Sequence, residues 1–323
     1  MKSFKPAHVA LAAFSLLGLA ACQGGADSGA PAGAYKPKGN VTMVVPFSAG
    51  GGSDQSGRAI AGGLEDITKG NITVENREGG SGAVGYSYFL SQKGNDRVLL
   101  ATETAMLALP LTQKVEFSYK DFTPIMKVAD DYTLVVVGKD SPYNTCTDVV
   151  GAAKSGRVVA AVSGATSLDE VVFTLIEKNQ SVKFDRVPFE SGGEVLAALL
   201  GKKIDVASLN PSEVSGQLEA GDLKALCAVS DKRYTYPSIA AVPTAKEQGI
   251  DVAFAQFRGF IAPGDISPEA KEYWINAAKE FEKSPAYTEY IEKNLLQANP
   301  AYGDDFTAYL DGNNAELQQS LTK

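Results

Sequence analysis

The chain has 323 residues, of which 38 are acidic and 30 are basic, and its formal net charge is −8. This acidic balance argues against a nucleic acid as partner, because nucleic-acid binding depends on clustered positive charge. The sequence contains one histidine, His8, and we expect processing to remove it, which excludes a Ser-His-Asp triad, a Cys-His pair and a histidine metal site. We therefore expect no enzyme, no metal and no cofactor, although carboxylate or lysine chemistry stays formally open.

The N-terminus has the pattern of a targeting segment. Lys2 and Lys5 precede a mostly apolar run over residues 8–21 that is too short for a comfortable transmembrane helix, so residues 1–21 are predicted to be a signal peptide. Small residues followed by Cys22 resemble a bacterial lipobox, which implies cleavage before Cys22 and a lipid on its sulfur; the alternative is an ordinary signal with an incidental cysteine. Residues 22–38 are rich in Gly, Ala, Ser and Pro and are predicted to form a flexible tether. We expect an exported protein anchored by its lipid to a bacterial membrane.

The first predicted element of the folded part is a strand over Val41–Val45, which runs into a glycine-rich loop and then a helix from Asp54 to Ile67. This order directs several backbone N–H groups to one point, where the helix dipole favours an anion. Glycine allows the backbone to approach a ligand closely. The residues predicted to bind the anion are Phe47, Ser48, Ala49, Gly50, Gly51, Gly52, Ser53 and Asp54.

A second loop of similar design follows about 30 residues later. A strand is predicted over Ile72–Glu75 and a helix over Val84–Gln92, with a glycine-rich segment between them. Two such units suggest neighbouring strands whose carboxyl ends share one edge of a sheet, which is where ligands bind in open α/β sheets. The residues predicted to contribute here are Gly80, Ser81, Gly82 and Ala83.

Three other interpretations of these motifs are weaker. The segment 52–59 nearly matches a P-loop but has Arg58 and Ala59 in place of the lysine and the hydroxyl residue. The segment 80–85 fits a dinucleotide-binding pattern, yet it lies on the second unit of an exported chain. Asp54 with Glu103 or Asp169 resembles a catalytic carboxylate pair, but we favour Asp54 as a cap of the first helix.

The remaining elements alternate between strand and helix patterns and predict an α/β fold. Further strands are predicted over Val98–Ala101, Thr133–Gly138, Val158–Val162, Lys183–Val187, Ile204–Ser208, Leu223–Val229 and Phe254–Ile261. Further helices are predicted over Leu168–Lys178, Glu194–Leu200, Ser212–Ala220, Ala245–Gln248, Pro268–Lys283, Ala286–Asn294 and from Gly303 to the C-terminus.

Two apolar runs, Tyr132–Val137 and Ala253–Phe257, are candidates for crossings between two lobes. They predict a first lobe over 39–134 plus 256–323, a second lobe over 135–255, and a hinge made of two crossovers. Arg258 follows the second crossover, where it can clamp a ligand carboxylate or pair with a local glutamate.

Two cysteines remain after Cys22, namely Cys146 and Cys227. Export permits a disulfide between them. The alternative is that Cys227 is a small core residue of its strand.

Several ordered segments resemble the extracytoplasmic solute-binding proteins of the tripartite tricarboxylate transporter family, also called the Bug family. The segments that carry the resemblance are 45–54, 76–85, 122–125, 187–189, 219–226, 242–244 and 260–263. The resemblance implies a two-lobed type II periplasmic-binding-protein (Venus flytrap) fold in which backbone groups of both glycine loops hold a ligand carboxylate, often through waters. The family often has an aromatic residue and a glycine where this chain has Arg258 between Phe257 and Gly259. This form with arginine resembles the pattern of the tricarboxylate-binding branch of the family.

The resemblance also implies side-chain contacts outside the glycine loops. The family commonly has a histidine after its third strand and in a second-lobe turn, where this chain has Thr102, Thr104, Thr166 and Ser167 without one. The residues to which contacts are assigned on this basis are Thr102, Thr104, Ser163, Thr166 and Ser167. Asn210 is assigned because it begins one of three polar turns of the second lobe, 163–167, 189–193 and 210–212, that are expected to face the glycine loops across a cleft.

The function predicted from the sequence is that of a monomeric, lipid-anchored receptor. It would capture a small di- or tricarboxylate such as citrate and deliver it to the membrane subunits of a tripartite transporter. A ligand-binding module for a two-component sensor is the alternative, and an exported enzyme is a weaker one.

Overall fold

The computed structural model describes residues 35–163, 167–189 and 191–321. The predicted signal peptide, Cys22 and most of the predicted tether lie outside these residues, as does Thr166. No helix within them combines the length and the apolar character needed to cross a bilayer.

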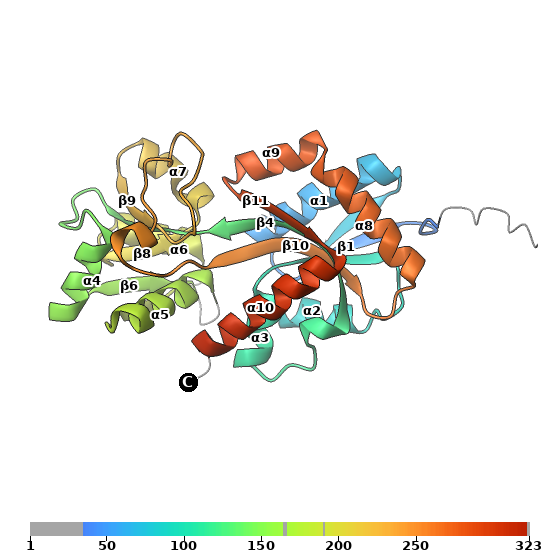
Figure 1. Cartoon of the computed structure of the whole chain (residues 1–323), viewed down its shortest axis with the longest axis horizontal. Coiled ribbons are helices and arrows are strands. Elements are labelled where there is room, and N and C mark those ends of the chain that lie inside the picture. The colour runs from blue at the N-terminus through green and yellow to red at the C-terminus, as the bar shows by residue number, and fades with distance from the viewer. Residues whose placement is uncertain (1–34, 164–166, 190, 322–323) are drawn as a thin grey trace, which may run out of the picture. The chain divides into compact units, whose positions relative to one another are not determined.

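A six-stranded mixed sheet forms the first layer, with the strand order β11-β4-β10-β3-β1-β2 (Figure 1). β1 pairs in parallel with both β2 and β3, so the loops that follow these three strands leave from one edge. Its strands are β1 (Val41–Val45), β2 (Ile72–Asn76), β3 (Val98–Thr102), β4 (Phe122–Tyr132), β10 (Ala255–Pro263) and β11 (Gln297–Tyr302). The accompanying helices are α1 (Gly52–Thr68), α2 (Ala83–Leu90), α3 (Ala105–Thr112), α8 (Pro268–Glu282), α9 (Pro285–Lys293) and α10 (Gly303–Leu321).

A five-stranded sheet has the order β7-β6-β8-β5-β9. Its strands are β5 (Leu134–Gly138), β6 (Val159–Val162), β7 (Asp185–Pro188), β8 (Val206–Leu209) and β9 (Leu223–Ala228). Its helices are α4 (Cys146–Ser155), α5 (Leu168–Gln180), α6 (Gly192–Leu200) and α7 (Pro211–Glu219). Short 3₁₀ turns lie at η1 (Gly80–Gly82), η2 (Tyr119–Asp121) and η3 (Lys246–Gln248).

The predicted α/β fold built on two sheets is confirmed. The chain leaves the first sheet where β4 ends at Tyr132 and enters the second at Leu134, and it returns where β10 begins at Ala255. β4 and β10 are antiparallel neighbours, with Ala255 opposite Tyr132, so both crossings lie side by side. The division at 134/135 and 255/256 itself stays a prediction.

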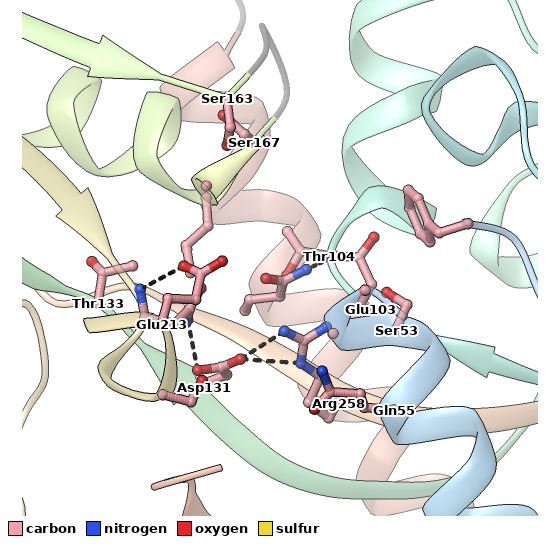
Figure 2. Close-up of a pocket in the computed structure, with 18 of the residues that line it drawn as sticks. Ser53, Gln55, Glu103, Thr104, Asp131, Thr133, Ser163, Ser167, Glu213 and Arg258 are labelled. Atoms are coloured by element: carbon pink, nitrogen blue, oxygen red, sulfur yellow. Dashed lines mark hydrogen bonds and ion pairs between the residues drawn. The ribbon is translucent and has the colours of Figure 1, made fainter. Parts of the chain in front are cut away.

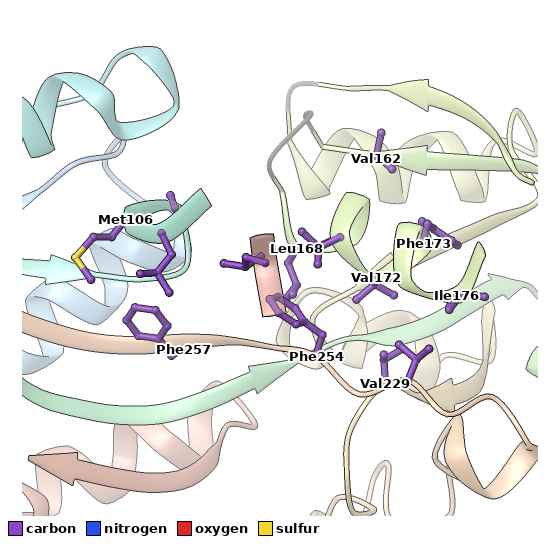
Figure 3. Packing of buried hydrophobic residues seen from close by; sticks show 14 of the residues in the cluster. Met106, Val162, Leu168, Val172, Phe173, Ile176, Val229, Phe254 and Phe257 are labelled. Carbon is purple, nitrogen blue, oxygen red and sulfur yellow. The ribbon is translucent and has the colours of Figure 1, made fainter. Parts of the chain in front are cut away.

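One buried hydrophobic cluster extends across the crossing strands. Met106 and Phe257 belong to its first-sheet part, and Val172 and Val229 to its second-sheet part. Phe254, just before β10, lies between the two groups in Figure 3. The two sheets therefore share continuous apolar packing at the crossing.

The second sheet carries a disulfide. Cys146 at the start of α4 is bonded to Cys227 in β9, with their Cα atoms 6.0 Å apart. Both cysteines are buried. This pairing is the first of the two alternatives left open by the sequence.

Candidate functional site

A cavity of about 610 Å³ is lined by residues from both sheets (Figure 2). One part of its wall comes from the first glycine loop, the junction between β3 and α3, and the strands β4 and β10. The turn after β6, the start of α6 and the β8–α7 junction supply the other.

The first glycine loop ends in a helix whose N-terminal amides are unpaired. Gly51 is the extended N-cap residue of α1, and no side chain caps this end of the helix. Within the described residues, the N–H groups of residues 51–54 have no recorded acceptor. Gly50, Gly51, Gly52 and Ser53 all line the cavity. A 17-residue helix thus presents the positive end of its dipole and free donors to the cavity.

Asp54 holds this loop in place and does not line the cavity. Its carboxylate accepts hydrogen bonds from the Gly50 amide at 2.8 Å and from Arg58 Nε and Asn76 Nδ2 at 2.9 Å each. Burial alone raises the pKa of Asp54, but these hydrogen bonds outweigh it, so the pKa lies below its usual range. Asp54 is the third residue of α1, so it braces the loop from inside the first turn and is not the N-cap residue.

The second glycine loop differs from the expectation. Gly82 donates its N–H to Gly79 O at 3.1 Å, and the Ala83 N–H bonds to Gly80 O, so these two amides are engaged within the loop. The segment forms a tight 3₁₀ turn in which only Ser81 lines the cavity. The prediction that both loops offer free amides was therefore wrong for Gly82 and Ala83.

The junction between β3 and α3 supplies a buried hydroxyl without a partner. Thr104 is 4% exposed, its Oγ1 has no hydrogen-bond partner, and it lines the cavity. Thr102 lies outside the lining, because its hydroxyl is 3.2 Å from that of Tyr86 in the core. Glu103 accepts hydrogen bonds from the Gln256 side chain and from the amides of Thr104 and Ala105. Burial raises the pKa of Glu103, and the charge of Arg258 opposes this shift.

Arg258 and Asp131 form a buried ion pair at the crossing. Nε and Nη2 of Arg258 lie 3.2 and 2.7 Å from one oxygen of Asp131, whose other oxygen accepts from Asn210 Nδ2 at 2.6 Å. The local partner of Arg258 is therefore an aspartate of β4, where the sequence suggested a glutamate. Arg258 Nη1 has no recorded partner among the described residues and remains available to a ligand.

The part of the wall from the second sheet is rich in hydroxyl and carboxyl groups. Asp169 accepts from the N–H and the hydroxyl of Ser163 at 2.7 and 3.0 Å and thereby shapes the turn after β6. Burial raises the pKa of Asp169 against these hydrogen bonds. Ser167 caps α5, and Glu213 is the third residue of α7. No cluster that could hold a metal ion occurs in the described ranges.

The cavity brings together twelve of the residues predicted from the sequence. They are Phe47, Ser48, Gly50, Gly51, Gly52, Ser53, Ser81, Thr104, Ser163, Ser167, Asn210 and Arg258. The predicted residues that the structure describes outside the lining are Ala49, Asp54, Gly80, Gly82, Ala83 and Thr102.

Sequence reasoning did not assign several polar lining residues to the site. They are Gln55, Asp131, Thr133, Ser208, Glu213, Gln256 and Asn294. Glu103 and Asp169 were considered only within a carboxylate pair, and Ser191 and Ser212 only as members of second-lobe turns expected to face the cleft. One signal was present for Glu213, because it stands three residues after the helix-capping Asn210. Asp131 offered none, because its strand was not predicted.

The sequence matches a known family over most of its length. Residues 57–312 match the family described as the tripartite tricarboxylate transporter family receptor. A protein encoded in the gbd 5′ region of Cupriavidus necator is 28% identical over 261 residues, covering 80% of this chain and 79% of that protein. BugT of Bordetella pertussis is 26% identical over 215 residues, or 65% of each chain.

Solved structures agree with the fold. A TctC solute-binding protein from Polaromonas, solved without ligand, has a TM-score of 0.77 and 26% identity, covering 89% of this chain and 99% of that one. MatC from Rhodopseudomonas palustris, solved with bound malate, has a TM-score of 0.75 and 19% identity, covering 88% and 100%. An R. palustris protein solved with adipate has a TM-score of 0.78 and 22% identity, covering 88% and 96%. The predicted two-lobed periplasmic-binding-protein fold is confirmed.

Proposed function

Because this chain belongs to the tripartite tricarboxylate transporter receptor family, we propose that it is an exported solute-binding protein that captures a small carboxylate in the cavity between its two sheets. The observation that carries this proposal is the N-terminus of α1, whose unpaired amides line the cavity. Unsatisfied donors and the helix dipole together make such an end a binding point for an anion.

Two side chains near the N-terminus of α1 can also bind the ligand carboxylate. The unpartnered hydroxyl of Thr104 is a donor or acceptor that a ligand can satisfy, since a buried polar group without a partner costs free energy. Nη1 of Arg258 adds a charged donor, and Nη2 of Arg258 lies 3.0 Å from the position of a Cβ built on Gly52. The guanidinium is therefore adjacent to the first turn of α1. The malate and adipate bound to MatC and to the second R. palustris protein are carboxylates of the size that this proposal envisages.

Binding is tested by calorimetry and thermal melting against a panel of mono-, di- and tricarboxylates that includes citrate, malate and adipate. A ligand that binds only the folded state raises the melting temperature in proportion to its affinity. We expect at least one member to bind and to stabilise the protein. An absence of binding across the panel contradicts the proposal.

The substitution Thr104→Val tests whether the ligand binds beside this hydroxyl. Loss of the hydroxyl hydrogen bond is expected to weaken binding by about 5- to 30-fold, the equivalent of about 1–2 kcal/mol. Thr102→Val is the matched control, because that hydroxyl is bonded to Tyr86 outside the cavity; it is expected to alter stability and not affinity. Equal affinities of the Thr104 variant and the wild type would place the ligand elsewhere.

We further propose that the protein is a monomer that carries a lipid on Cys22 and delivers its ligand to the membrane subunits of a tripartite transporter. The lipobox-like sequence and the family support this proposal. Cys22→Ser is expected to move the protein from the membrane fraction to the soluble fraction, and mass spectrometry of the wild-type N-terminal peptide is expected to show acyl chains. An unmodified Cys22 in the exported protein would refute the anchor and leave ligand capture untouched.

A further inference from the structure

The charges that line the cavity do not suit a ligand that is purely anionic. Among the described lining residues there are four carboxylates and one cation, Arg258. That cation is already paired with Asp131 at 2.7 Å. Among the described residues, no lysine or arginine lies within ion-pair distance of the other three carboxylates, Glu103, Asp169 and Glu213.

Two of these three carboxylates are held by internal donors. Asp169 accepts from Ser163 and from the Glu170 amide, and it is 4% exposed. Glu103 is also 4% exposed and accepts from Gln256 and from the following backbone amides. Both carboxylates are therefore stabilised by protein donors without a ligand.

Glu213 is different. Its Oε2 accepts the Asn210 N–H at 3.2 Å, and its Oε1 has no recorded donor among the described residues. A Cβ built on Gly192 would lie 2.5 Å from Oε1, so the glycine at the start of α6 leaves the space that this carboxylate occupies. Desolvation raises the pKa of Glu213, while the Asn210 N–H and the charge of Arg258 oppose this shift. Its side chain is exposed to the cavity, and its ionised form has no lysine or arginine within ion-pair distance among the described residues.

A second, independent observation indicates a polar occupant. Thr104 Oγ1 is buried and unpartnered in the first-sheet part of the same wall. In Figure 2, Thr104 and Ser53 lie on one side of the Asp131–Arg258 pair and Glu213 on the other. A ligand that reaches Glu213 from the α1 terminus thus has an anionic end in a donor-rich region and its other end beside an unpaired carboxylate.

We propose that the physiological ligand is a zwitterion, an amino-carboxylate whose carboxylate binds at the N-terminus of α1 and whose positively charged nitrogen binds Glu213. This inference rests on the proposed function and narrows its ligand class. A dicarboxylate of similar length would bring its second anionic group against Glu213, where like charges repel. A charged amine instead gains an ion pair there without any change in the first-sheet contacts.

Matched ligand pairs test the inference. Calorimetry at neutral pH would compare glutamate with glutarate, γ-aminobutyrate with butyrate, and β-alanine with propionate. We expect the amino member of at least one pair to bind about 10-fold or more tightly than its partner. Equal or tighter binding of the amine-free acid in every pair overturns the inference while leaving carboxylate capture intact. Binding of neither member in any pair overturns the inference, and the carboxylate panel then decides the proposed function.

Glu213→Gln assigns the selectivity to this side chain. Glutamine retains an oxygen that can accept the Asn210 N–H, so the start of α7 is preserved. The affinity ratio within the best pair is expected to fall by about 10-fold. Glu219→Gln, the same change on the same helix outside the cavity, is expected to leave the ratio unchanged. An unchanged ratio in the Glu213 variant, or an equal loss for both members of the pair, contradicts the role given to Glu213.

Discussion

Gly57 allows α1 to pack closely on the sheet, and replacing it with alanine perturbs the element that forms the anion site. A Cβ built at this position would lie 2.5 Å from Val45 Cγ2 in β1 and 3.3 Å from Ala101 Cβ in β3. Neither neighbour can withdraw easily, because both are buried in the sheet. Gly62 lies in the same helix, and a Cβ there would meet nothing within 4 Å.

The two substitutions separate packing from helix propensity. Alanine in a helix is favoured over glycine by about 0.5–1 kcal/mol, and this gain applies to both variants. Overpacking a buried contact costs about 1–3 kcal/mol, and this cost applies to Gly57→Ala alone. We expect Gly57→Ala to lose about 1–2 kcal/mol of unfolding free energy and Gly62→Ala to gain about 0.5–1 kcal/mol.

Urea denaturation with linear extrapolation measures both values, and calorimetry with a carboxylate ligand measures the consequence for the site. Displacement of α1 in the Gly57 variant is expected to weaken ligand binding, whereas the Gly62 variant is expected to bind like the wild type. Stabilisation of the protein by Gly57→Ala to the same extent as by Gly62→Ala would refute the close packing of α1 on β1 and β3.

Three further predictions concern stability. Reducing the disulfide, which spans 81 residues, is expected to lower the unfolding free energy by about 4.5 kcal/mol in the chain-entropy account; coincident urea transitions with and without dithiothreitol would contradict it. Asp131→Asn leaves the guanidinium of Arg258 buried without its counter-charge and is expected to cost about 3 kcal/mol or more, whereas exposed Asp251→Asn is expected to have little effect; similar denaturation midpoints for the two variants would argue against the buried pair. Because the pKa of Asp54 is lowered in the folded state, its ionised form stabilises the fold above the ordinary aspartate range, and this stability is lost as the pH falls through the folded pKa. The difference in unfolding free energy between wild type and Asp54→Asn should therefore be largest near neutral pH and shrink in acid, and a difference independent of pH would contradict this assignment.

The first glycine loop was predictable because its determinants are local. A short apolar strand, a run of glycines and a helical pattern lie within 30 residues, and the structure places β1, the loop and α1 in that order. The second loop has a similar composition, but its turn is closed by its own carbonyl groups. Composition does not reveal which amides a turn uses internally.

Two strands missed by sequence reasoning, β4 and β11, depend on tertiary contacts. The helices α3 and α4 were also missed, although Thr145 and Asp148 form a local capping box at the start of α4. β4 contains Lys127 and Asp130, whose charges are typical of a loop, yet these side chains pair at 2.7 Å in the interior. β11 contains Pro300 and lies at the edge of its sheet, where a proline is tolerated. Because β4 was missed, Asp131 was not connected to Arg258, and the acidic character of the cavity was not foreseen.

We expect the amides at the start of α1 to bind the ligand carboxylate, and amide NMR during a ligand titration tests this most directly. We expect the proton resonances of Gly51, Gly52 and Ser53 to move downfield and to saturate with the dissociation constant measured by calorimetry. Unchanged resonances of these three amides while the ligand saturates the protein would contradict the claim.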